Sequence, residues 1–224
     1  MRVVQKRRPP QTIPQTKGDA ITNLETPPAA RAAFNRIEKR IVRQQLAAEQ
    51  DALCAFCMRR IDPTRLDDRG EPTMKIAHRM PIAVRPQSAL DWANLFGSCD
   101  GGQRSEGRYR TCDLAQEDTA LTVDPSDATH VARLRFERRA AVSGLFLTSD
   151  EPHLRGDVET TLALNSGELP ELREAVWKAF QTLFLGGKPK NAFGKAAMRA
   201  YFREWRARSR LAPEMLGVIE KRIA

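Results

Sequence analysis

The spacing of hydrophobic residues predicts helices at both ends of the chain and shorter elements between them. A first helix is expected over residues 28–51, with an apolar stripe on one side and Arg and Lys on the other. Thr26 and the two prolines after it are a typical start signal for this helix. The stripe consists of Phe34, Ile37, Ile41 and Leu46. Residues 1–28 are rich in Pro, Thr, Lys and Arg and predict an extended basic arm.

The middle of the chain has short apolar runs between polar and glycine-rich loops. Residues 73–82 (TMKIAHRMPI) predict a short strand. Residues 84–99 (VRPQSALDWANLFGSC) predict a loop and then a second short element, and residues 112–127 start with a short helix or turn.

The last part of the chain is predicted to be mainly helical after one pair of strands. Residues 131–147 alternate apolar and basic positions about a small turn, which indicates a hairpin. Residues 157–187 indicate a helical hairpin that a Gly-Gly pair ends. Residues 191–210 and 212–223 predict two further amphipathic helices. The apolar side of the hairpin's second helix consists of Leu172, Val176, Phe180, Leu183 and Phe184.

Composition indicates a soluble globular protein. The chain has 224 residues, of which 41% are hydrophobic and 29% charged, so it is long enough to bury a substantial core. No run approaches the roughly 18 apolar residues that a membrane-spanning helix needs. The basic N-terminus is not followed by the apolar core of a secretory signal. We therefore expect a cytoplasmic protein without a membrane partner.

The formal net charge of +9 has two possible interpretations, which are binding to a polyanion and solvation of a basic surface. Lys and Arg favour polyanions, because their contacts with phosphates release counterions. A basic surface that is only solvated would carry the same charge.

The four cysteines all lie between residues 54 and 112, and their spacing indicates a zinc site. Cys54 and Cys57 are two residues apart, which allows one tight turn to direct both thiolates at one metal ion. Cys99 and Cys112 would complete the site, although twelve residues separate them. Four thiolates leave zinc no open position, so its role would be structural. The alternative is four ordinary buried thiols.

His78 lies between the two cysteine pairs, and by itself it has a simple explanation. A single histidine in an apolar strand is more often a packing residue than a ligand or a base. Its surroundings change that weighting, because the segments CAFC, KIAHRMPI, LDWANLFGSC and TCDLAQED together resemble an HNH nuclease. That resemblance implies an α+β fold: a ββα-metal HNH core with a four-cysteine zinc knuckle, flanked by an N-terminal helix and a helical C-terminal region.

The chain more narrowly resembles the PtuB-like HNH proteins of Septu antiphage systems, which also accompany some retrons. The segments behind this likeness are MRVVQKRRPP, LDWANLFGSCDGG, TCDLAQED, the VDP turn at 123–125 and TLALNSGELPELRE. The likeness covers about residues 1–180 and implies an ABC/SMC-like (PtuA-like) ATPase as the partner that gates the nuclease.

The HNH resemblance also implies roles for individual residues. His78 would be the general base that takes a proton from water, since histidine titrates near neutral pH. Asn94 would hold the loop that orients it, and Mg²⁺ or Mn²⁺ would stabilise the charge on the phosphate.

Two motif positions depart from the family pattern. The residue before the base is often a metal ligand, but here it is Ala77, which has no ligand atom. For the third position we expect Asp113 first and Gln116 second, because residues at i and i+3 share a face of a helix. Asp91 and Asp118 are further candidates, and each of these side chains has the alternative of being a solvated polar residue.

The loop over residues 101–110 (GGQRSEGRYR) is basic and is a candidate nucleic-acid contact. Arg104, Arg108 and Arg110 would meet phosphates while Tyr109 stacks on a base, or the loop would be an ordinary exposed one. The basic C-terminal helices are either packed amphipathic helices with a solvated face or a partner surface.

The expected organisation is therefore an arm (1–28), an HNH nuclease core with the zinc site (29–128) and a mainly helical, partner-binding region (129–224). The expected function is DNA cleavage by an HNH endonuclease, the effector of an antiphage system. One alternative is a non-catalytic nucleic-acid-binding zinc module that has lost its catalytic metal ligands, which Ala77 favours. Another is a purely structural zinc protein, against which the pair of His78 and Asn94 argues.

Overall fold

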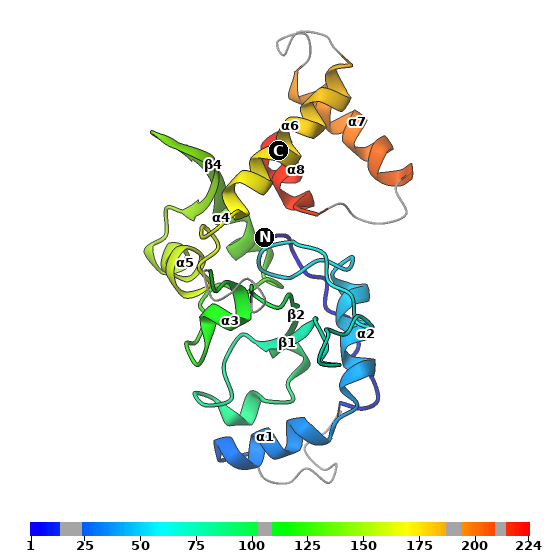
Figure 1. The fold of residues 1–224 in the computed structure, drawn as a ribbon, viewed down its shortest axis with the longest axis vertical. Coiled ribbons are helices and arrows are strands. Elements are labelled where there is room, and N and C mark those ends of the chain that lie inside the picture. Colours follow the sequence, from blue (N-terminus) through cyan, green and yellow to red (C-terminus); the bar gives the residue numbers. More distant parts are fainter. Residues whose placement is uncertain (14–23, 103–108, 187–193, 209–213) are drawn as a thin grey trace.

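A computed structural model of the chain describes residues 1–13, 24–102, 109–186, 194–208 and 214–224 (Figure 1). The fold is α+β, with two small antiparallel sheets among the described residues. The elements are α1 (Pro27–Arg36), α2 (Lys39–Glu49), β1 (Lys75–His78), β2 (Leu95–Ser98), α3 (Cys112–Gln116), α4 (Ala128–Arg133), β3 (Leu134–Arg139), β4 (Val142–Ser149), α5 (Pro152–Gly156), α6 (Leu169–Leu185), α7 (Lys195–Arg208) and α8 (Leu216–Ile223).

Strands β1 and β2 form the antiparallel pair that positions the candidate site. Ala77 pairs with Phe96 and His78 with Leu95. Because side chains alternate across a strand, Ala77 points into the core, where it is 0% exposed, while its neighbour His78 points the other way. The short helix α3 packs on β1. Figure 1 shows this unit in the middle of the molecule, with α1 below it and α6, α7 and α8 above.

The single helix predicted over 28–51 is wrong, because the chain forms α1 and α2 with a break between them. Thr26 caps α1 as predicted: its side chain accepts the N–H of Ala29. The break comes at Ile37, which is extended (ψ 153°) and buries its side chain. Glu38 then caps α2 by accepting the N–H of Arg40. The new start rotates α2, so Ile41 of the predicted stripe is 40% exposed.

The C-terminal predictions are confirmed in outline. The predicted hairpin is β3 and β4, although its first residues belong to α4. The helical hairpin is α5, extended by a π-helical turn (Asp157–Thr161), followed by α6, which ends at Gly186 in the left-handed conformation (φ 52°). On the predicted apolar side of α6, Phe180 is buried at 2% exposed, whereas Leu183 is 58% exposed.

One main cluster of buried side chains extends across the boundary predicted at residue 128 and includes residues from both ends of the chain. Met1 and Ile13 of the predicted arm are at most 1% exposed. The backbone N–H of Met215, just before α8, donates to Met58 in the cysteine turn. Among the described residues, no helix combines the length and apolar character needed to cross a bilayer.

Candidate metal centre and active site

The four cysteines converge on one point, although they come from three separate segments of the chain. Cys54 and Cys57 lie in the turn after α2, Cys99 follows β2, and Cys112 begins α3. Their Sγ atoms all lie within 4.8 Å of one another. The Sγ–Sγ distances are 3.8 Å for Cys54–Cys112 and 3.7 Å for both Cys57–Cys99 and Cys99–Cys112.

These sulfur separations fit a tetrahedral zinc ion. Zn–S bonds are about 2.3 Å long, so a regular ZnS₄ tetrahedron has edges of about 3.8 Å. A disulfide would bring two sulfurs to about 2.05 Å, and all four thiols are free. The four cysteines could therefore hold a metal ion such as zinc, and their donor set leaves no open position on it.

Backbone hydrogen bonds build the turn that presents the first two thiols. The N–H of Cys54 donates to Arg59 (2.8 Å), and the N–H of Met58 donates back to Cys54 (3.0 Å). The N–H of Ala55 donates to Gly97 of β2 (3.0 Å), which joins the turn to the sheet. A Cβ at position 97 would lie 2.6 Å from Cε of Met74, so a larger residue there would require the Met74 side chain to shift.

The pKa values of the Cys54 and Cys112 thiols are shifted in opposite directions. At Cys54, burial acts to raise the pKa, but hydrogen bonds from the other three thiols lower it well below the ordinary value. At Cys112, hydrogen bonds with Cys54 raise the pKa, and burial adds to the increase. The thiols therefore cannot all be deprotonated without compensation, and a divalent cation would supply the charge that lets them become thiolates together.

His78 is held in one orientation at the end of β1. Its Nε2 lies 3.0 Å from the carbonyl oxygen of Ala89, which can only accept, so Nε2 carries the proton. The ring also meets Phe34 of α1 edge-on, at 4.6 Å between ring centroids. Burial lowers the pKa of His78 to about 4, and the nearby charge of Arg31 also lowers it. The ring is therefore neutral at pH 7, and Nδ1 has no hydrogen-bond partner in the described part of the chain.

Asn94 holds the loop that contains Ala89, the hydrogen-bond partner of His78. Its Oδ1 accepts the N–H of Met80 (2.7 Å), and its Nδ2 donates to the carbonyls of Met80 (3.0 Å) and Ser88 (3.1 Å). Ala89 follows Ser88 directly, so these bonds fix the carbonyl that accepts the hydrogen bond from Nε2–H of His78. Asn94 is 4% exposed, and its Nδ2 also donates to Oγ of Ser88 (3.2 Å), so all of these bonds are to Met80 and Ser88.

A cavity of about 300 Å³ lies beside the ring of His78 and has two unlike walls. Helix α1 supplies Arg31, Phe34 and Asn35 to one wall. Carboxylates from α3 and the residues after it line the other wall: Asp113, Glu117 and Asp118. Their ligand atoms do not converge as the thiols do in the described residues. Burial raises the pKa of Asp113 to about 6, with a contribution from the charge on Cys54.

The structure places the two candidates for the third motif position, Asp113 and Gln116, in different surroundings. Gln116 is 1% exposed, and its amide donates to the backbone carbonyls of His78 (2.9 Å) and Thr119 (3.0 Å). It therefore joins α3 to β1 and does not line the cavity. Asp91 does not line this cavity either. Its carboxylate accepts the N–H of Ala93.

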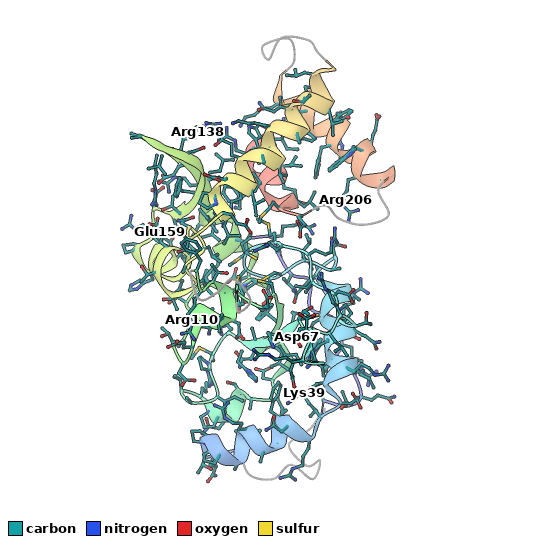
Figure 2. The ribbon with its side chains drawn as sticks, viewed as in Figure 1. Lys39, Asp67, Arg110, Arg138, Glu159 and Arg206 are labelled. Carbon is teal, nitrogen blue, oxygen red and sulfur yellow. The ribbon has the colours of Figure 1, made fainter. Side chains whose placement is uncertain are left out.

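Two residues of the predicted nucleic-acid loop, Arg104 and Arg108, lie outside the described residues. Tyr109 is 52% exposed, and its ring lies so close to Gly167 that a Cβ there would be 3.1 Å away. Arg110 pairs with Glu117 at 2.5 Å and lies beside α3 in Figure 2.

Sequence reasoning missed three polar residues that line the cavity: Glu117, Arg31 and Asn35. Glu117 follows Asp113 by four residues, which is a helical repeat that could have identified it. No comparable signal exists for the other two, because their place depends on how α1 packs.

The fold and the cysteine cluster define an α+β protein with a candidate zinc centre. No protein-family model matches the chain, and comparison with curated proteins also found no match.

Proposed function

We propose that the chain is a metal-dependent HNH endonuclease that hydrolyses phosphodiester bonds of DNA. The observation that carries the proposal is the state of His78: a neutral ring, fixed through Nε2, with an available lone pair on Nδ1. A positioned neutral imidazole can take a proton from water, although a pKa of about 4 makes His78 a weaker base than an ordinary histidine. The pair of antiparallel strands followed by α3 on β1 is consistent with a ββα-metal core.

In the proposed reaction, Nδ1 of His78 takes a proton from water while the water oxygen forms a bond to phosphorus. The bond between phosphorus and the leaving sugar oxygen breaks, and that oxygen takes a proton. The imidazolium then returns its proton to solvent, so the base is regenerated. Asn94 and Ala89 keep the ring in place throughout. They do so through hydrogen bonds and do not contact the reacting atoms.

Asp113, Glu117 and Asp118 line the cavity with the oxygen donors that Mg²⁺ or Mn²⁺ prefers, but their ligand atoms do not converge in this structure, so they would have to move together to hold the cation. When bound, the cation would stabilise the negative charge that develops on the phosphate. These side chains would replace the ligand that Ala77 lacks.

The role we propose in the cell is that of the nuclease effector of an antiphage system, gated by an ABC/SMC-like ATPase. The excess of positive charge suits DNA as the substrate. The helical C-terminal region supplies exposed basic residues on α7, which are Lys195, Arg199 and Arg203, as a surface for the partner.

A second candidate function is a nucleic-acid-binding zinc module without catalysis. Ala77 favours it, because the side chain before the proposed base is 0% exposed and offers no ligand atom.

The test is plasmid cleavage by the purified protein with Mg²⁺ or Mn²⁺, compared with H78A and with H153A as a matched control. His153 is exposed on α5 and does not line the cavity, so H153A should cleave as the wild type does. We expect cleavage that H78A abolishes.

Cleavage retained by H78A would reject His78 as the base. If the wild type binds DNA but does not cleave it, alone or with the ATPase, the non-catalytic module is the better description.

A further inference from the structure

Arg173 of α6 is the largest side chain among the described residues that is fully buried. Its guanidinium donates to three uncharged acceptors: the carbonyl of Leu164 (2.6 Å), Oδ1 of Asn165 (3.2 Å) and the carbonyl of Leu145 (3.3 Å). Its Nε has no hydrogen-bond partner in the part of the chain that the structure describes.

No carboxylate compensates this charge among the residues that the structure describes. The neighbouring Glu174 pairs instead with Arg138 (2.8 Å) and Lys178 (3.1 Å). Buried charges are normally paired, because the loss of water is costly to an ion that has no partner. Arg173 therefore needs a negative group in the interior.

The cysteine cluster is the neighbouring group that can become negative. The N–H of Cys112 donates to Leu162 (2.9 Å), two residues before the carbonyl that Arg173 holds. Burial lowers the pKa of Arg173 to about 10, and the charges of Cys57 and Cys112 oppose that decrease. None of the sulfurs is a hydrogen-bond partner of Arg173, so the attraction is through space.

We propose that Arg173 is a positioning residue of the metal centre, which supplies the counter-charge that four thiolates and one Zn²⁺ require. Such a centre has a net charge of about −2, so a buried cation beside it is stabilised and stabilises the bound metal in return. The inference concerns zinc binding only and is independent of the proposed nuclease activity.

In this arrangement, bound zinc would help to hold α6 on the core. Helix α6 packs on β4 and α8 and extends away from the rest of the molecule toward α7 (Figure 1). Loss of the metal would leave Arg173 buried without a counter-charge, and the contact between α6 and β4 would weaken. Zinc would then control how firmly the helical region is held on the core.

The experiment measures the zinc affinity of the full-length protein by competition with a chromophoric chelator. The variants are R173M, which removes the charge but retains much of the volume, and R173K, which keeps the charge but loses the forked hydrogen bonds. Arg59 provides the matched control, because it also feels the charge of Cys57 but is 41% exposed and paired with Glu168. Hydrogen exchange of α6, with and without zinc, is the second readout.

We expect R173M to lower zinc affinity by about 10- to 100-fold, as changes beside metal ligands do, while R173K stays nearer to the wild type and R59M changes little. Removal of zinc should increase hydrogen exchange in α6. Wild-type affinity in R173M, or an equal loss in R173K and R173M, would overturn the proposal. If R173M does not fold, R173K decides: a loss beyond about tenfold contradicts the role of charge, and a smaller loss supports it.

Discussion

The side chain of Asn94 forms two hydrogen bonds with the backbone of one residue, Met80, fourteen positions earlier in the chain. Oδ1 of Asn94 accepts the N–H of Met80 at 2.7 Å, and Nδ2 of Asn94 donates to the carbonyl of Met80 at 3.0 Å. The loop between them contains Ala89, whose carbonyl fixes the ring of His78. Asn94 thus orients the proposed base without touching it.

Replacement of Asn94 by alanine should destabilise the protein by about 2–3 kcal/mol, because buried groups of Met80 and Ser88 lose their partners. Urea unfolding would measure this change. Gln87 is exposed in the same loop, so Q87A should stay within about 0.5 kcal/mol of the wild type. Equal unfolding free energies for N94A and Q87A would contradict the role of Asn94.

The buried His78 should make stability depend on pH. Its folded pKa is about 4, below the ordinary value of 6.5, so between these values the unfolded chain binds more protons. Stability therefore falls as the pH decreases, and His78 should contribute a loss of about 1 kcal/mol between pH 7.5 and pH 5.5. Urea unfolding of the wild type and H78Q in excess zinc would measure it.

The comparison with H78Q removes the effect of the charged groups that face His78, which are Arg31, Asp113, Glu117 and Asp118. The same slope in both proteins would show that His78 does not titrate in this range.

Metal removal should unfold or strongly destabilise the core. The four thiols lie at the meeting point of the cysteine turn, β2 and α3, so the free energy of metal binding is also folding free energy. C54S, or treatment of the wild type with a strong chelator, should lower the melting temperature, and added Zn²⁺ should restore it only in the wild type. A melting temperature that is intact in both cases would reject the four-cysteine site.

Glu49 should be required for the position of the N-terminal segment. Its side chain is 0% exposed and lies 3.5 Å from the ammonium group of Lys6, and it accepts the indole N–H of Trp92 at 3.2 Å. E49L leaves Lys6 buried without its partner and should cost about 3–5 kcal/mol of unfolding free energy.

The double variant K6M/E49L tests whether that cost comes from the unpaired charge. It should recover much of the stability that E49L loses, because it removes both charges from the interior. Urea unfolding of the two variants in parallel gives the comparison. No recovery would indicate that the loss comes from packing instead.

DNA binding should weaken steeply with salt. Each phosphate contact made by Lys or Arg adds about −0.9 to the slope of log affinity against log salt concentration. Arg110 is already paired with Glu117, so R110A should change this slope less than an unpaired contact would. Fluorescence anisotropy with a labelled duplex measures the slope, and a flat response would remove the argument for phosphate contacts.

Local patterns predicted the elements whose causes lie within a few residues. The cap at Thr26, the β3–β4 hairpin and the stop at Gly186 depend on nearby backbone geometry, and all three are confirmed. The break between α1 and α2 was missed, because it depends on Ile37 turning toward a core built from distant residues.

The sequence by itself determined the composition of the candidate site: four cysteines with a two-residue spacing in the first pair, one histidine on a strand, and an asparagine before the next strand. These are properties of residue type and short spacing. Only the tertiary structure decided that the thiols lie at tetrahedral separations, that Glu117 joins Asp113 in the cavity while Gln116 does not, and that Arg173 is buried with only uncharged hydrogen-bond acceptors around it. Burial and charge compensation arise between segments that are far apart in the chain, so no local pattern encodes them.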